Sequence, residues 1–132
     1  MAGFISALGA VYKALVSGLT RKGVKVGGTA SYPRVEVHSV VEQEPTDKGG
    51  IVRTITCIVE SMSEDKMADV MQMNEGNLER LVAQALNLGE SWRIIDIIPG
   101  QLQEMTESTE TNKILYRLLQ NITVYVERLT TE

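Results

Sequence analysis

The chain has 132 residues, with 13 lysines and arginines against 17 aspartates and glutamates, so its formal net charge is −4. This length predicts a single domain with a moderate core, and the acidic balance argues against a protein that coats nucleic acid. The one cysteine, Cys57, has no partner for an internal disulfide, which favours a reducing compartment. The amino-terminal apolar run lacks the basic start of a secretory signal and is too short and polar to span a bilayer, so no membrane partner is expected.

Charge is distributed unevenly along the chain. Residues 1–35 carry 5 basic residues and no acid, whereas all 17 acids lie in 36–132. The stretch between Arg93 and Lys113 has no basic residue, and its acids are Asp96, Glu104, Glu107 and Glu110. We interpret this stretch either as a solvated loop or as a surface that repels a passing polyanion or meets a basic partner.

Apolar residues at helical spacing predict a first helix over 3–20, which we expect to pack on a sheet. They are Phe4, Leu8, Val11, Leu15 and Leu19. Residues 20–31 contain glycines and are expected to form a flexible connector. This connector lacks the Gly-Lys-Ser/Thr ending of a P-loop and the glycine spacing of a dinucleotide fingerprint.

Two strands are predicted over 33–61, joined by a turn segment at 43–50, and together they form an antiparallel hairpin. In the first strand, one face should carry Val35, Val37, Ser39 and Val41. The second strand, 51–61, is rich in β-branched residues. Its apolar face should carry Ile51, Ile55, Cys57 and Val59.

A second amphipathic helix is predicted over 64–88, with Ser63 as its N-cap and Gly89 at its end. Glu64 and Asp65 would favour the positive end of its dipole. Its stripe consists of Met67, Val70, Met71, Asn74, Leu78, Leu81, Val82, Ala85 and Leu88. We interpret the methionines as core or adaptable contact residues rather than as a soft-metal site.

A long pair of strands is predicted over 92–105 and 113–129, with an acidic loop at 104–112 between them. Pro99-Gly100 should bend the first of these strands or place a bulge in it. Residues 114–120 are also compatible with a helical turn, but the clean alternation that follows them favours a strand. We expect 113–129 to be an edge strand that needs a partner or a cover.

The sequence offers little for catalysis or metal binding. His38 is the only histidine and lies on a polar strand face, so a structural or solvated histidine is expected. Cys57 lies on an apolar strand face and is expected to be a buried small hydrophobe. We therefore expect no enzyme activity, no cofactor and no metal. A small enzyme with a site assembled from scattered acids is the competing hypothesis.

These elements predict an α+β fold, a mostly antiparallel four-stranded sheet with two helices packed on it in the order α-β-β-α-β-β. Through Tyr32–His38, Ile51–Glu60, the helix and strand that follow, and the closing stretch Asn112–Glu127, the chain resembles the tail-terminator (tail-completion) proteins of tailed bacteriophages. The resemblance covers most of 4–129 and lies in the order of the helices and strands and in their general residue pattern. The long acidic-tipped second hairpin departs from many members of that family.

The resemblance implies a non-enzymatic virion protein that is assembled in the cytoplasm of the bacterial host. Such proteins form a ring, commonly a hexamer, that caps the finished tail tube and joins it to the head connector, with DNA only as passing cargo. Alternative hypotheses are another head–tail neck or connector protein, and a small bacterial ligand-binding or regulatory domain.

Candidate residues for the ring interface are Arg21, Lys22, Lys25, Glu104, Glu107, Glu110, Tyr125 and Glu127. The acidic loop has three interpretations: it lines a ring channel and repels DNA, it docks on the basic segment 21–25 of a neighbour, or it is merely solvated. The expected core consists of Leu8, Val11, Leu15, Val35, Val37, Ile55, Val70, Leu78, Leu81, Val82, Ile122 and Val124.

Overall fold

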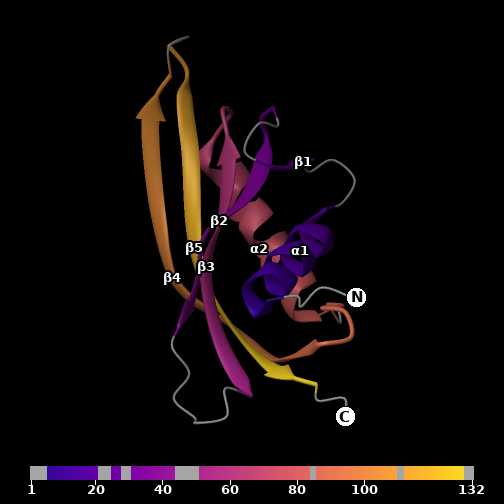
Figure 1. Ribbon diagram of the computed structural model, residues 1–132. Helices are drawn as coiled ribbons and strands as arrows, with labels where there is room; N and C mark the ends of the chain where they lie inside the picture. Colours follow the sequence, from indigo (N-terminus) through magenta and orange to yellow (C-terminus); the bar gives the residue numbers. More distant parts are fainter. Residues whose placement is uncertain are drawn as a thin grey trace.

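The computed structural model describes residues 6–20, 25–27, 31–43, 51–83, 86–109 and 112–129. Its helices and strands, in chain order, are α1 (Ala7–Leu19), β1 (Lys25–Val26), β2 (Arg34–Gln43), β3 (Val52–Ser63), α2 (Met67–Ala83), β4 (Trp92–Ser108) and β5 (Ile114–Arg128). The strands form one sheet in the order β1-β2-β3-β5-β4, and both helices lie against one of its faces (Figure 1). The α+β class is confirmed, with five strands in place of the expected four.

The additional strand, β1, lies inside the segment that we expected to be a flexible connector. Lys25 and Val26 pair in parallel with Arg34 and Val35, and the Gly27 N–H donates to the Val35 carbonyl at 2.9 Å. The expectation of a connector is therefore wrong for these residues. A strand of two residues is too short to show the alternation by which strands are recognised in a sequence.

The core lies between the helices and the sheet. The Ser6 hydroxyl caps α1 by accepting a hydrogen bond from the Gly9 N–H at 3.0 Å. Expected core residues that are buried are Val11, Leu15, Val35, Val37, Ile55, Val70, Leu81, Ile122 and Val124. Leu8 and Leu78 are partly buried. Val82 is exposed, so its assignment to the core is wrong.

The first predicted strand changes faces part-way along its length. The β2–β3 ladder is antiparallel, as expected, but its register shifts between His38 and Val41. Ser39, inside this bulge, has φ 55°. An inserted residue reverses the alternation beyond it. Val40 therefore packs against the core and Val41 is exposed, which corrects the predicted face of this strand.

Helix α2 begins later than the sequence suggested. Ser63 belongs to β3, and its hydroxyl accepts from the Asp65 N–H at 3.1 Å, so Ser63 is not the N-cap of a helix that starts at Met67. Of the predicted stripe, Met71 is exposed, and Ala85 lies outside the described residues. Leu88 is buried but not helical.

Two buried amides fix α2 against the sheet. Asn77 Nδ2 donates to Ser61 Oγ at 3.0 Å, and Asn74 Nδ2 donates to Gln120 Oε1 at 3.2 Å. Gln120 Nε2 in turn donates to the Gly100 carbonyl at 2.9 Å. Asn77 lay outside the predicted stripe, because a buried amide with a partner on the sheet is indistinguishable in sequence from a solvated one.

β4 extends beyond its predicted end at residue 105 to Ser108, and the order of the strands in the sheet differs from the expectation. Residues 114–120 form strand, as expected, and a register shift between Pro99 and Leu102 confirms the predicted bulge. Glu104 and Glu107 lie within β4 rather than in a loop. β5 lies between β3 and β4, so the expectation that 113–129 forms a sheet edge is wrong, and β4 is the edge strand instead. In the described part of the chain, no helix is both long and apolar enough to cross a membrane.

Leu81→Ala should lower the free energy of unfolding by about 2–5 kcal/mol, because it removes buried methyl groups and leaves a cavity. The Leu81 side chain is 1% exposed, whereas its chain neighbour Val82 is 58% exposed. Val82→Ala is therefore the matched control and should change stability by less than about 0.5 kcal/mol. Urea unfolding of both variants measures the difference, and equal losses would contradict the assigned core face of α2.

Candidate assembly surface

The outer strand of the sheet, β4, presents a long exposed edge. It pairs with β5 on one side, and no other described strand pairs with its second side. Every residue from Ile98 to Ser108 is exposed. Three of these are large apolar residues, with exposed fractions of 45% for Ile98, 48% for Leu102 and 37% for Met105. An edge strand with exposed apolar side chains is a template for pairing with another chain.

The two halves of β4 differ in how well they resist such pairing. The first half has register shifts between Ile94 and Asp96 and between Pro99 and Leu102. Bulges and proline are devices by which proteins blunt a sheet edge. The second half, Leu102–Ser108, pairs with β5 without interruption and contains no proline and no lysine. This segment is therefore the part of the edge that is best suited to contact another protein chain.

A groove lined by both apolar and charged side chains, Arg93 and Asp96 among the latter, runs beside the first half of β4. It has a volume of about 310 Å³ and lies between the end of α2 and the strand. Its lining residues include Leu81, Val82, Leu86, Ile94 and Ile97. The exposed Val82 side chain thus belongs to the wall of a groove next to the sheet edge.

The predicted interface residues are divided between the two edges and the centre of the sheet. Lys25 is exposed on β1 and donates to Ser31 Oγ. Glu104 and Glu107 are exposed on β4, at the opposite edge. Tyr125 and Glu127 lie on the interior strand β5, where the Arg93 Nε donates to the Glu127 carboxylate at 2.6 Å. Arg21, Lys22 and Glu110 lie outside the described residues.

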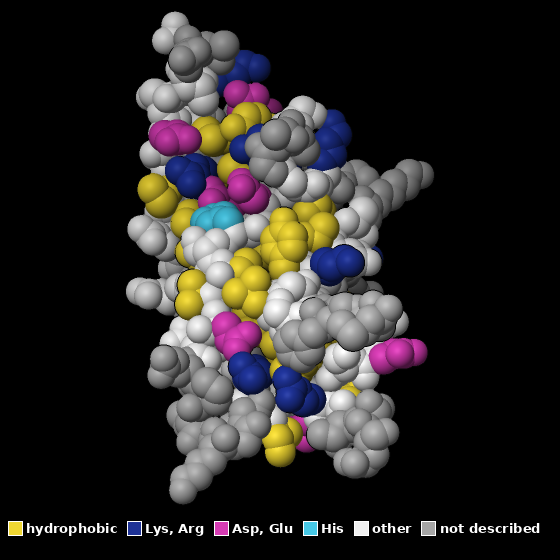
Figure 2. All heavy atoms as spheres, viewed as in Figure 1, with side chains coloured by type: hydrophobic (Ala, Val, Ile, Leu, Met, Phe, Trp, Pro, Cys, Tyr) yellow, Lys and Arg dark blue, Asp and Glu magenta, His cyan; other side chains and the backbone are white. Residues whose placement is uncertain are grey.

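A charged cluster lies on the sheet face opposite the helices. Glu60 on β3 has a side chain that is 2% exposed, and its Oε1 lies 2.7 Å from His38 Nε2 on β2. Arg117 on β5 donates to the second carboxylate oxygen, Oε2, and its guanidinium also lies 3.6 Å from the Glu107 carboxylate on β4. Figure 2 shows the histidine (cyan) with acidic and basic side chains beside it. This Glu60 cluster links four neighbouring strands.

Opposing effects act on the pKa of Glu60. Burial raises this pKa, but the hydrogen bonds and positive charge of Arg117 and His38 together lower it more, so it lies below its ordinary value of 4.5. The hydrogen bond to Glu60 raises the pKa of Arg117. Glu60 and Arg117 are therefore a charged pair at neutral pH. The sequence alone does not predict this cluster, because its members lie on four strands whose adjacency local patterns do not reveal.

Cys57 and His38 both have structural surroundings. Cys57 is buried, as expected, and desolvation raises its pKa to about 12, so the thiol stays protonated at neutral pH. His38 holds a structural position against Glu60. Within the described ranges, no group of three histidine, cysteine, aspartate or glutamate residues is placed to hold a metal ion.

Comparison with known proteins shows a shared fold. No family model matches the chain, and no curated protein matches its sequence. Its structure is similar to a chain in the solved structure of the virion of a native gene transfer agent (GTA) particle, with a TM-score of 0.65 and 16% identity. The match covers 92% of this chain and 95% of that chain. The two chains therefore share one architecture over nearly their whole lengths.

Glu60→Gln should lower the free energy of unfolding by about 1–3 kcal/mol at pH 7, because Arg117 loses a charged acceptor in a desolvated position. The folded-state pKa of Glu60 lies below 4.5, so the stabilisation is fully present above that pH. It is lost as the pH falls through the folded pKa, where the wild-type carboxyl also becomes neutral. The difference between wild type and variant should therefore shrink in acid. Urea unfolding at pH 7 and across the acid range measures it.

Glu42→Gln is the matched control for this experiment. Glu42 also pairs with an arginine across β2 and β3, at 2.6 Å from Arg53 Nη1, but its side chain is 24% exposed. An ion pair that water reaches contributes about 0–1 kcal/mol. A Glu60→Gln loss no larger than the Glu42→Gln loss, or one that is unchanged in acid, would show that the Glu60 cluster does not stabilise the sheet.

Proposed function

We propose that this chain is a non-enzymatic structural protein of a phage-like virion and that it serves there as a tail terminator. The observation that supports this best is the fold that it shares, over 92% of its length, with a chain of the GTA virion. In this role the chain forms a ring that caps the finished tail tube and meets the head connector. It assembles in the cytoplasm of the bacterial host, and DNA passes through the ring as cargo.

A protein with this role must bind copies of itself, and the sheet provides a suitable surface. The edge segment Leu102–Ser108 is regular and exposed, and it lacks the proline and the register shifts that interrupt the first half of β4. Contact with a neighbouring subunit would cover this edge and remove the aggregation hazard that it poses. Closed rings arise when two different surfaces of identical subunits meet head to tail. The exposed β4 edge therefore supports a cyclic homo-oligomer, for which we propose six subunits.

A head–tail neck or connector protein with the same fold is the alternative. Both roles use a ring, and they differ in what the ring binds. A tail terminator binds the end of the tail tube and stops its growth, whereas a connector protein binds the head side and leaves tube length unchanged. The effect on tube length therefore distinguishes them.

The purified chain should form a closed ring with about six times the mass of one chain, because cyclic closure satisfies every subunit edge. Multi-angle light scattering over a range of concentrations measures this mass. Added to growing tail tubes from the particle that carries it, the ring should appear at one end of each tube and limit tube length in electron micrographs. Tubes grown without the protein are the control. A monomer at every concentration, with no binding to tube ends, would refute the proposed function.

A further inference from the structure

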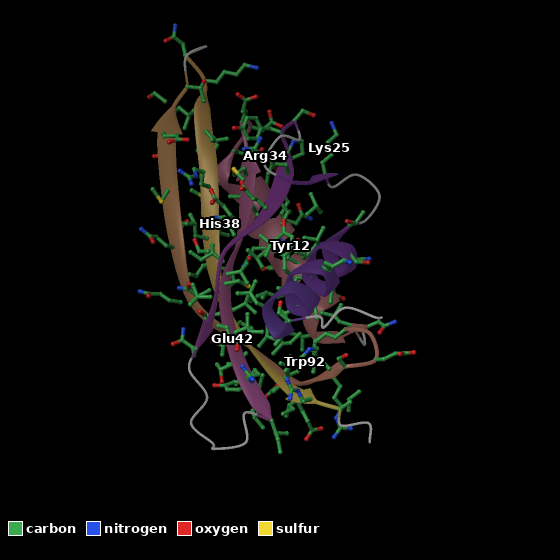
Figure 3. All side chains as sticks on the ribbon, in the orientation of Figure 1. Tyr12, Lys25, Arg34, His38, Glu42 and Trp92 are labelled. Atoms are coloured by element: carbon green, nitrogen blue, oxygen red, sulfur yellow. The ribbon has the colours of Figure 1, made fainter. Side chains whose placement is uncertain are left out.

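The two edges of the sheet carry opposite charge. Glu104 and Glu107 are exposed on the β4 edge, and Glu104 has no ion pair among the described residues. At the other edge, Lys25 is exposed on β1, and Arg34 follows it on β2 with its guanidinium 4.6 Å from the Tyr32 ring centre. Figure 3 shows Lys25 and Arg34 near each other at one end of the sheet. One edge is thus acidic and the other basic at this end.

The pairing register places these charges at the same level along the strands. Lys25 is opposite Arg34, Arg34 is opposite Met62, Met62 is opposite Arg117, and Arg117 is opposite Met105. Lys25 and Met105 therefore end the same row across the sheet, and Glu104 and Glu107 lie on either side of Met105. A ring has no shift along its axis from one subunit to the next. Acidic and basic groups at one level can meet in such a ring without displacement.

Strand directions are also compatible with direct contact between the edges. β1 is parallel to β2, and the β2–β3, β3–β5 and β5–β4 pairs are all antiparallel. β4 consequently runs opposite to β1 and β2. When copies are related by rotation about an axis close to the strand direction, β4 of one copy lies antiparallel to β1 and β2 of the next. Antiparallel pairing is the arrangement that the rest of the sheet already uses.

We propose that the ring closes by contact between the acidic β4 edge of one copy, Leu102–Ser108, and the basic β1–β2 edge of a second copy, centred on Lys25. This inference rests on the proposed ring and names its interface. Leu102 and Met105 supply exposed apolar area beside the charges. Glu104 and Glu107 supply the negative charge that attracts Lys25 and Arg34 of the neighbouring subunit.

The same charges disfavour a symmetric pairing of two β4 edges. Such a contact would bring Glu104 and Glu107 of one copy against Glu104 and Glu107 of the other, and like charges in a contact are destabilising. The proposed head-to-tail contact avoids this repulsion. Glu36 is the acid on β2 nearest to Arg34. The row of paired residues that starts at Glu36 ends on β4 at Gln103, so the β4 residue at the level of Glu36 is uncharged.

A charge exchange between the two edges tests the proposal. Glu104→Lys and Lys25→Glu should each weaken self-association at least about fivefold, because each places like charges across the contact. The double variant should recover most of the wild-type association, because it restores opposite charges in exchanged positions. Glu75→Lys, on the exposed surface of α2, makes the same charge change away from both edges and is the control. Sedimentation equilibrium at two salt concentrations measures association, and thermal unfolding verifies that each variant is folded.

The outcomes separate the interface from the ring itself. Two weakened single variants with recovery in the double variant support the proposed contact. If both single variants form rings as stable as those of the wild-type chain, the proposed contact is overturned and the proposed function stands. Single variants that weaken the ring without recovery in the double variant also overturn it, because the two charges then act in different places. A wild-type chain that never forms a ring overturns both proposals.

Discussion

The pairing of β3 with β5 is the interaction on which the rest of this structure depends. Their ladder runs without a register shift from Val52 opposite Glu127 to Ser63 opposite Tyr116. It joins two hairpins, β2–β3 and β4–β5, that α2 separates in the chain. The joined sheet presents a continuous apolar face that is wide enough for both helices (Figure 1). Because β5 occupies the place beside β3, β4 becomes the outer strand and its long edge faces outward.

Polar side chains on both faces of this ladder add specificity to it. On the helix side, Asn77 bonds Ser61 of β3, while Asn74 reaches Gln120 of β5 and, through it, the bulge carbonyl of Gly100. On the other face, Glu60 joins His38 and Arg117. A buried polar group that loses its partner is costly, so these contacts penalise a shifted helix or a slipped strand. Hydrophobic contacts alone would tolerate more alternatives.

The strand order also arranges the charge of the chain. Lys25 and Arg34, from the basic first part of the chain, lie on β1 and β2, whereas Glu104 and Glu107, from the acidic stretch after Arg93, lie on β4 at the opposite edge of the sheet. A protein whose two sheet edges attract each other is suited to head-to-tail assembly of several identical subunits rather than to a symmetric dimer. The proposed ring and its interface both follow from this placement.

Local patterns in the sequence determined the two helices, the four long strands and most of their apolar faces, but not the two-residue strand β1 or the change of face in β2. Alternation identified the inward residues Ile55, Ile122 and Val124, and proline marked the bulge at Pro99. These features depend on neighbours within a few residues along the chain. The α+β class and the buried state of Cys57 follow from the same kind of information.

Only the tertiary structure decided which strands adjoin, and the errors in the sequence analysis follow from that. Periodicity reports that a strand has an apolar face, but it carries no information about which strand lies beside it. The last strand, β5, was therefore predicted at the sheet edge, whereas it pairs with β3 on one side and with β4 on the other, so β4 is the edge strand. For the same reason the Glu60 cluster could not be predicted, because its members come from strands far apart in the chain. Non-local pairing brings these residues together, and it determines which surface is left for a partner.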